Sequence, residues 1–104
     1  MPKFMFIYHG GGRPESEEDQ HKAMAAWGAF YEKMGSAVVH GGGPAGASQT
    51  VSAAGVAADG GANPVSGLTL VSADSIEAAV EMAKGCPLVI EGDGSVEVAE
   101  MIEM

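Results

Sequence analysis

The chain is poor in cysteine and in basic residues, and each shortage excludes a class of function. Cys86 is the single cysteine, so no disulfide can form within the chain, and we expect a reducing compartment, the cytoplasm. Five lysines and arginines stand against 14 acidic residues, giving a formal net charge of −9. Binding to nucleic acid or to an anionic membrane requires clustered cations. We therefore expect neither as a partner.

Long apolar runs and metal-ligand spacings are also missing. No segment approaches the roughly 18 apolar residues of a membrane helix, and the N-terminal apolar run is too short for a signal peptide. No helical histidine pair, cysteine pair or calcium-binding loop occurs, so we expect no metal and no other cofactor. The triple glycines at 10–12 and 41–43 have neither the Rossmann spacing nor a Walker lysine, which excludes the common phosphate-binding loops.

The segment 63–87 largely determines the predicted fold class, because it contains a strand, a cap and a helix in succession. Residues 65–71 are β-branched and apolar and follow turn residues, which predicts a strand. Asp74 is the predicted N-cap, with Glu77 three residues later as in a capping box. Gly85 and Pro87 then predict the helix end. Four apolar residues follow the i, i+3, i+4, i+7 spacing of a buried helix face: Ile76, Ala79, Val80 and Ala83.

A second predicted helix covers residues 16–34. Ser16 is its N-cap candidate, with Asp19 three residues later, and Gly35 is its predicted C-terminal glycine. Five side chains share an arc of about 100° and form its predicted buried face: Ala23, Trp27, Phe30, Tyr31 and Met34. His21 falls at the edge of the polar face, where a solvated residue is expected.

The complete pattern predicts a single domain over residues 1–104. Strands are expected near 3–9, 36–41, 65–72 and 95–102, helices near 16–34 and 74–84, and an extra arm near 49–53, with a glycine-rich loop at 10–14 and another at 55–62. This order is that of an α+β, ferredoxin-like split βαβ fold, an antiparallel sheet with both helices on one face.

The first strand is apolar on both sides, with Phe4, Phe6 and Tyr8 on one and Met5 and Ile7 on the other. The helices of a split βαβ unit cover only one sheet face. An exposed apolar sheet exceeds what monomers tolerate, so we expect a homodimer in which two sheets pack face to face.

Six ordered segments resemble those of the YCII-related family, also called the DGPF-domain family: residues 4–11, 25–28, 40–44, 64–67, 78–87 and 95–98. The resemblance covers nearly the whole chain and implies a ferredoxin-like subunit in a dimeric α+β barrel. Some YCII relatives carry a His-Asp pair, and a few are lyases that remove chloride from aromatic compounds. That pair is not assigned here, and the Asp-Gly-Pro-Phe motif is reduced to Asp59-Gly60, followed by Gly61-Ala62.

Four residues are candidates for a functional site, each with a structural alternative. His9 and His40 each end a predicted strand before a triple glycine, and histidine is the side chain that titrates near neutral pH. Trp27 and Tyr8 are expected to form an aromatic pocket wall between helix and sheet. Plain core packing is the alternative for Trp27, and a structural role is the alternative for the histidines and for Cys86.

Two hypotheses follow. In the first, the chain is a small homodimeric YCII-related protein that binds a small organic molecule through Trp27, Tyr8 and His40. In the second, it is a lyase or isomerase of a small aromatic or lactone-like compound, with His9 as the catalytic acid or base and Trp27 stacking on the substrate.

Overall fold

Four strands form one antiparallel sheet, in the order β2-β5-β1-β6. The computed structural model describes residues 1–11 and 15–103. The strands are β1 (Lys3–Gly10), β2 (Val38–Pro44), β5 (Val65–Ser72) and β6 (Gly94–Glu100). This order, with β1 and β5 at the centre, confirms the predicted ferredoxin-like sheet. The predicted loop 10–14 lies partly outside the described residues.

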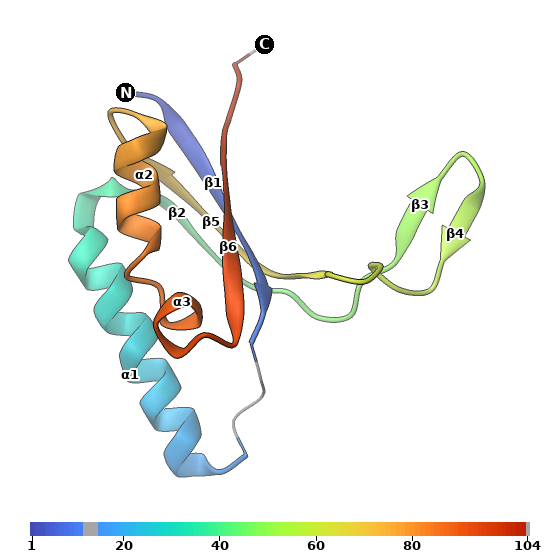
Figure 1. Cartoon of the computed structure of the whole chain (residues 1–104), viewed down its shortest axis with the longest axis horizontal. Coiled ribbons are helices and arrows are strands. Elements are labelled where there is room, and N and C mark those ends of the chain that lie inside the picture. The colour runs from blue at the N-terminus through green and yellow to red at the C-terminus, as the bar shows by residue number, and fades with distance from the viewer. Residues whose placement is uncertain (12–14, 104) are drawn as a thin grey trace.

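Three α-helices pack on one face of this sheet: α1 (Glu17–Met34), α2 (Ile76–Ala83) and α3 (Pro87–Glu91), as Figure 1 shows. A 3₁₀ turn, η1 (Gly35–Ala37), follows α1. The hydroxyl of Ser16 accepts a hydrogen bond from the Asp19 amide at 3.1 Å, which confirms the predicted cap. Phe30 and Met34 are buried, and Trp27 and Tyr31 pack against the core, as the predicted arc requires.

The second helix differs from the prediction at both ends. The predicted Asp74 cap is wrong, because Ser75 is extended and its hydroxyl accepts from the Ala78 amide at 3.2 Å. The short helix α3 was not predicted. Pro87 was expected only to stop a helix, but here it begins one, at a position where its missing N–H is not needed.

The alternation along β1 separates the two faces of the sheet. Phe4, Phe6 and Tyr8 are at most 3% exposed and face the helices. Met5, Ile7 and His9 point to the opposite side, which no element of the described chain covers. We call this side the open face; its apolar members, set by the strand pairing, are Met5, Ile7, Leu68, Leu70 and Ala99.

β6 is shorter than predicted. It ends at Glu100, so Ile102 lies beyond the strand and is 73% exposed instead of sharing a face with Val96 and Val98. Those two valines do pack against the core on the helix side.

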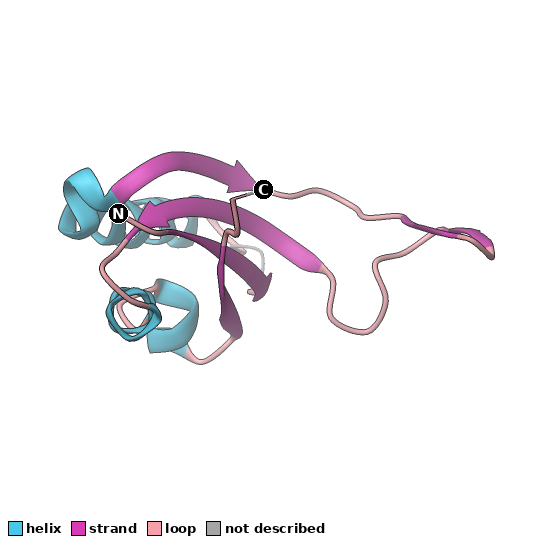
Figure 2. Ribbon diagram, turned by 90° about the horizontal axis from the view of Figure 1, so that it is seen from above, coloured by secondary structure: helices cyan, strands magenta, loops and turns pink. Residues whose placement is uncertain are grey.

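A two-stranded hairpin forms a separate small sheet, β3 (Thr50–Ser52) paired with β4 (Gly55–Ala57). The predicted arm near 49–53 corresponds to β3. The prediction of a loop over 55–62 was wrong at its start, since residues 55–57 form β4. Figure 2 shows the hairpin standing well outside the main body.

Candidate functional site

A cleft of about 590 Å³ opens between α1 and the end of the sheet. Tyr8 from β1 and Trp27 and Tyr31 from α1 form its aromatic wall, and Gly43 and Gly67 contribute bare backbone from β2 and β5. Gly67 lets these groups approach closely, because a Cβ would lie 3.2 Å from the Tyr8 ring and 3.1 Å from the Gly43 carbonyl oxygen, a tight contact. The strands thus place Tyr8 at the base of a cleft that α1 closes on one side.

The aromatic wall has a defined geometry. The rings of Tyr8 and Trp27 meet edge to face, with centroids 5.0 Å apart and an interplanar angle of 83°. Tyr31 lies one helical turn from Trp27, with centroids 6.3 Å apart and a tilt of 36°. Edge-to-face and tilted pairs are the favoured aromatic arrangements, so these rings hold one another in position.

Hydroxyl groups behind the wall form a closed hydrogen-bond network. Tyr8 donates to the Thr69 hydroxyl at 2.8 Å, and the Thr69 and Tyr31 hydroxyls are 2.8 Å apart. Both lie 3.2 Å from the carbonyl oxygen of Gly41. A carbonyl oxygen can only accept. One of the Thr69 and Tyr31 hydroxyls therefore donates to Gly41, and the other donates to its partner hydroxyl. Burial raises the pKa of Tyr8, so its phenol stays neutral.

The described residues that line the cleft include no aspartate, glutamate, lysine, arginine or histidine. The polar side chains among them are Tyr8, Tyr31, Gln20 and Ser66. A site of this kind can sandwich a flat ring and exchange hydrogen bonds with it.

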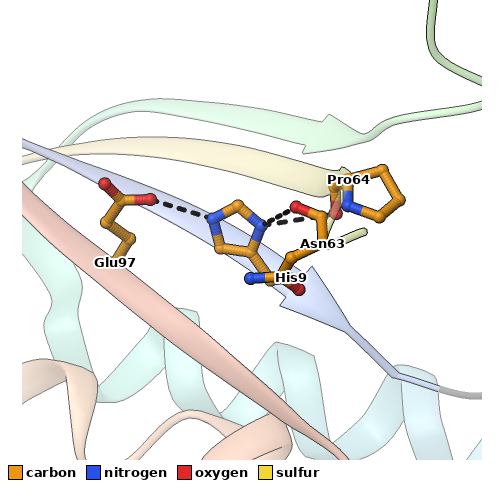
Figure 3. Close-up of polar contacts among 4 residues, drawn as sticks. All are labelled: His9, Asn63, Pro64 and Glu97. Carbon is orange, nitrogen blue, oxygen red and sulfur yellow. Dashed lines mark hydrogen bonds and ion pairs between the residues drawn. The ribbon is translucent and has the colours of Figure 1, made fainter. Parts of the chain in front are cut away.

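His9 lies on the open face, on the other side of the sheet from this cleft. Its Nδ1 is 3.0 Å from the Asn63 carbonyl oxygen and 3.3 Å from that of Pro64, and its Nε2 is 3.0 Å from Oε1 of Glu97 (Figure 3). The side chain of His9 is 13% exposed and that of Glu97 is 62% exposed.

These contacts favour the protonated imidazole. Carbonyl and carboxylate oxygens only accept, so both ring nitrogens must donate, and only the imidazolium has two N–H groups. The hydrogen bond to Glu97 is the largest influence and raises the pKa of His9; burial opposes it, and the hydrogen bonds to Pro64 and Asn63 raise the pKa further. The His9 ring therefore joins β1, β6 and the segment before β5.

The other two histidines lie apart from both features. His40 is exposed in β2, opposite Leu70, and its Nδ1 accepts from the Gly42 amide at 3.0 Å. β5 separates β2 from β1, so His40 and His9 do not meet. His21 is exposed on α1.

The structure thus brings Tyr8 and Trp27 together and leaves His9 and His40 on the opposite face. It adds three residues that the sequence reading did not select as site residues: Tyr31, Thr69 and Glu97. Tyr31 could have been found, because it lies four residues after Trp27 on the predicted buried arc. Thr69 and Glu97 depend on strand register, which the sequence pattern does not reveal.

Cys86 is fully buried, and burial raises the pKa of its thiol, so its environment is that of a structural cysteine.

Within residues 1–11 and 15–103, no three metal-ligating side chains gather to hold an ion. None of the helices in that part of the chain is both long and apolar enough to cross a membrane.

One solved structure is similar over the whole chain. It is the 5-chloro-2-hydroxyhydroquinone dehydrochlorinase from Burkholderia phenoliruptrix AC1100, in complex with 2,5-dihydroxybenzoquinone, with a TM-score of 0.60 and 17% identity over 100% of this chain and 96% of the other. What the two share is the α+β fold. No protein-family model matches the chain, and no curated protein matches it. At this identity the likeness describes architecture and leaves activity to be argued from the site.

Proposed function

We propose that the protein is a homodimer of the YCII-related type, one domain per chain over residues 1–104, that binds a small, flat aromatic compound in the cleft beside Trp27. The observation that carries this proposal is the aromatic wall formed by Tyr8, Trp27 and Tyr31. The cleft volume of about 590 Å³ lies within the usual range for small-molecule pockets. The dehydrochlorinase of the same fold binds a one-ring quinone, a ligand of the size proposed here.

Binding is favoured over catalysis because of the side chains that line the cleft. Proton transfer needs a group with a pKa matched to the operating pH, and the described lining offers only neutral hydroxyl and amide groups. Those groups recognise hydroxyl and carbonyl substituents on a ring. We therefore expect a ligand that is uncharged or weakly charged where it enters the cleft.

The homodimer is proposed from the open face. Leu68 is 40% exposed there, and Met5, Ile7, Leu70 and Ala99 are apolar residues of the same face. A two-fold partner that applies the same face removes this surface from water.

The single cysteine, a buried free thiol, suits a reducing compartment, and we place the dimer in the cytoplasm on that ground.

Trp27 is the only tryptophan in the chain, so its fluorescence reports directly on the cleft. We expect saturable quenching by hydroquinone, a flat ring that is uncharged at neutral pH, and no saturable effect from cyclohexane-1,4-diol, its saturated and non-flat counterpart. N-acetyltryptophanamide measures the collisional quenching to be subtracted. The same linear response from the protein and from this free indole would contradict binding in the cleft.

Two alanines of α1 provide matched variants. Ala23 lines the cleft, whereas Ala25 is exposed and does not. Ala23→Leu should weaken the ligand affinity measured by quenching about tenfold or more, because overfilling a formed site costs about 1–3 kcal/mol. Ala25→Leu makes the same chemical change outside the cleft and should leave the affinity unchanged. Equal weakening in both variants would remove the cleft as the binding site.

The second candidate is an enzyme, a lyase or isomerase of a small aromatic or lactone-like compound. The observation that favours it is the pair formed by His9 and Glu97, whose Nε2 and Oε1 are 3.0 Å apart. The imidazolium would act as the acid once Glu97 released Nε2. In this case His9→Gln should abolish turnover with no loss of dimer, and Ala23→Leu should affect turnover much less. A His9→Gln variant with full turnover would remove His9 from the mechanism.

A further inference from the structure

The hairpin formed by β3 and β4 exposes two apolar side chains far from the core. Val51 and Val56 are cross-strand partners, and they are 78% and 65% exposed. Figures 1 and 2 both show the hairpin projecting away from the sheet and helices. A lone two-stranded hairpin is marginally stable in water and usually needs a further packing partner. Within the described chain nothing covers this pair.

The segment that carries the hairpin is held in a specific shape. The Thr50 hydroxyl donates to the Asp59 carbonyl oxygen at 2.7 Å, and an Asp59 carboxylate oxygen accepts from the Gly61 amide at 3.0 Å. The two legs touch at Gly60, where a Cβ would lie 2.9 Å from Cβ of Ser48 and 2.7 Å from Cβ of Pro64. Glycine is therefore required at this crossing. The legs form a narrow stalk that presents the valine pair at its end.

His9 ties the base of this stalk to the open face. Its Nδ1 holds the carbonyl oxygens of Asn63 and Pro64, at the end of the second leg, and its Nε2 holds Glu97 of β6 (Figure 3). Ala45, at the start of the first leg, donates its amide to the Ser66 carbonyl at 2.9 Å. The stalk thus leaves the sheet at a fixed point that is continuous with the apolar open face.

The charge distribution selects the kind of partner. The chain has a net charge of −9, so two copies repel each other wherever acidic side chains face acidic side chains. In the segment 45–64 Asp59 is the one ionisable side chain, and on the open face Glu97 is paired with His9. A second copy can approach these two regions at little electrostatic cost. A basic partner would find no acidic cluster on the hairpin to bind.

We propose that the hairpin is an intersubunit arm, and that Val51 and Val56 of each protomer pack against a second copy of this chain at the margin of the paired open faces. This inference rests on the proposed homodimer and adds to it a second contact region. His9 is a positioning residue in this arrangement, because it sets where the arm leaves the sheet.

Sedimentation velocity of a double variant tests the arm directly. Val51→Asn with Val56→Asn should weaken dimerisation by about tenfold or more, since each dimer would lose the burial of four valine side chains. The control is Ile90→Asn on α3, where Ile90 is 72% exposed on the helix side of the sheet. It should leave the dimer constant unchanged. Far-ultraviolet circular dichroism of all variants should match that of the wild type.

Crosslinking gives an independent measurement that does not rely on lost stability. With p-benzoylphenylalanine in place of Val51, irradiation should yield a covalent dimer, and a mixture of ¹⁴N and ¹⁵N protein should yield crosslinked peptides of mixed isotope. If the double variant dimerises as strongly as the wild type and no crosslink forms between subunits, the proposal of an intersubunit arm is wrong. The proposed homodimer would not be affected by that result. A monomeric wild-type protein would overturn both, while ligand binding in the cleft would still be judged by Trp27 fluorescence.

Discussion

Both faces of the sheet carry apolar side chains, yet the subunit covers them very differently. On β5, Val71 is fully buried against the helices, whereas Leu68 on the opposite side is 40% exposed. On β1, Phe6 is fully buried and its neighbour Ile7 is only partly buried. Alternation assigns residues to faces, but it does not say what covers each face. The chain's own helices cover one, and we attribute the cover of the other to a second subunit.

This difference also separates the two candidate chemistries. The aromatic cleft belongs to the helix side, where Tyr8 and Trp27 meet. The charged pair of His9 and Glu97 belongs to the open face, beside the base of the arm. Ligand binding and subunit contact are thus assigned to opposite sides of one sheet, and variants on one side should leave the other function intact.

The largest effect is expected from Phe6→Ala. Phe6 is fully buried, so its truncation should lower the free energy of unfolding by about 3–5 kcal/mol at any protein concentration. Ile7→Ala is the matched variant on the other face. The loss of unfolding free energy caused by Ile7→Ala should be smaller, and it should decrease as the protein is diluted below the dissociation constant of the dimer. Urea unfolding at two protein concentrations measures both, and a concentration-independent loss for Ile7→Ala would argue against a partner on the open face.

Leu68→Glu should separate the subunits. Leu68 faces Ile7 and Gly43 across the strands, so a carboxylate there would lie opposite an apolar side chain and a glycine and would be buried in the dimer at a cost of several kcal/mol per ion. We expect a folded monomer in sedimentation at micromolar concentration. Ile90→Glu, the control on α3, should remain dimeric. A dimeric Leu68→Glu protein would mean that the subunits meet elsewhere.

The order of the main elements could be predicted from the sequence because the signals are local. Ser16 precedes a helix with a clear apolar arc, and the stretch 65–71 has strong β-propensity, so the split βαβ order follows. Local signals were ambiguous where neighbouring residues could serve the same role. Asp74 and Ser75 can both cap a helix, and a proline such as Pro87 can either stop a helix or, as here, begin one.

The site was less predictable, because it depends on contacts between distant segments. Trp27 and Tyr8 were each selected, but their ring contact depends on how α1 packs on β1. Glu97 is 88 residues from His9 in sequence, and only the register of β1 against β6 brings them together. The Thr69 network likewise requires β5 to lie beside β1 with Gly67 opposite Tyr8.

Thr69→Val should cost about 1–3 kcal/mol of unfolding free energy, because it leaves the buried Tyr8 hydroxyl without its acceptor while keeping the side-chain shape. Thr50→Val is the matched control. The Thr50 hydroxyl also donates a hydrogen bond, to Asp59, but it is exposed on the arm and its loss should cost much less. Thermal unfolding of the two variants makes the comparison, and equal costs would contradict a structural role for the network.

The smallest effect should be the pH dependence at His9. Its folded-state pKa is raised above the ordinary value of 6.5 by the hydrogen bond to Glu97 and by the carbonyl groups of Pro64 and Asn63. The stabilisation is therefore complete below pH 6.5 and is lost as the pH rises through the raised value. An NMR titration of the His9 ring should give a midpoint above 6.5. Glu97→Gln should lower that midpoint, and an ordinary midpoint in the wild type would contradict the hydrogen bonds assigned to His9.

The central claim is that a second copy of the chain covers the open face of the sheet, and the mass of the wild-type protein in solution tests it most directly. Sedimentation equilibrium at micromolar concentration should give twice the chain mass of 10.5 kDa. A single species with the mass of one chain, still fully folded by circular dichroism, would contradict the account.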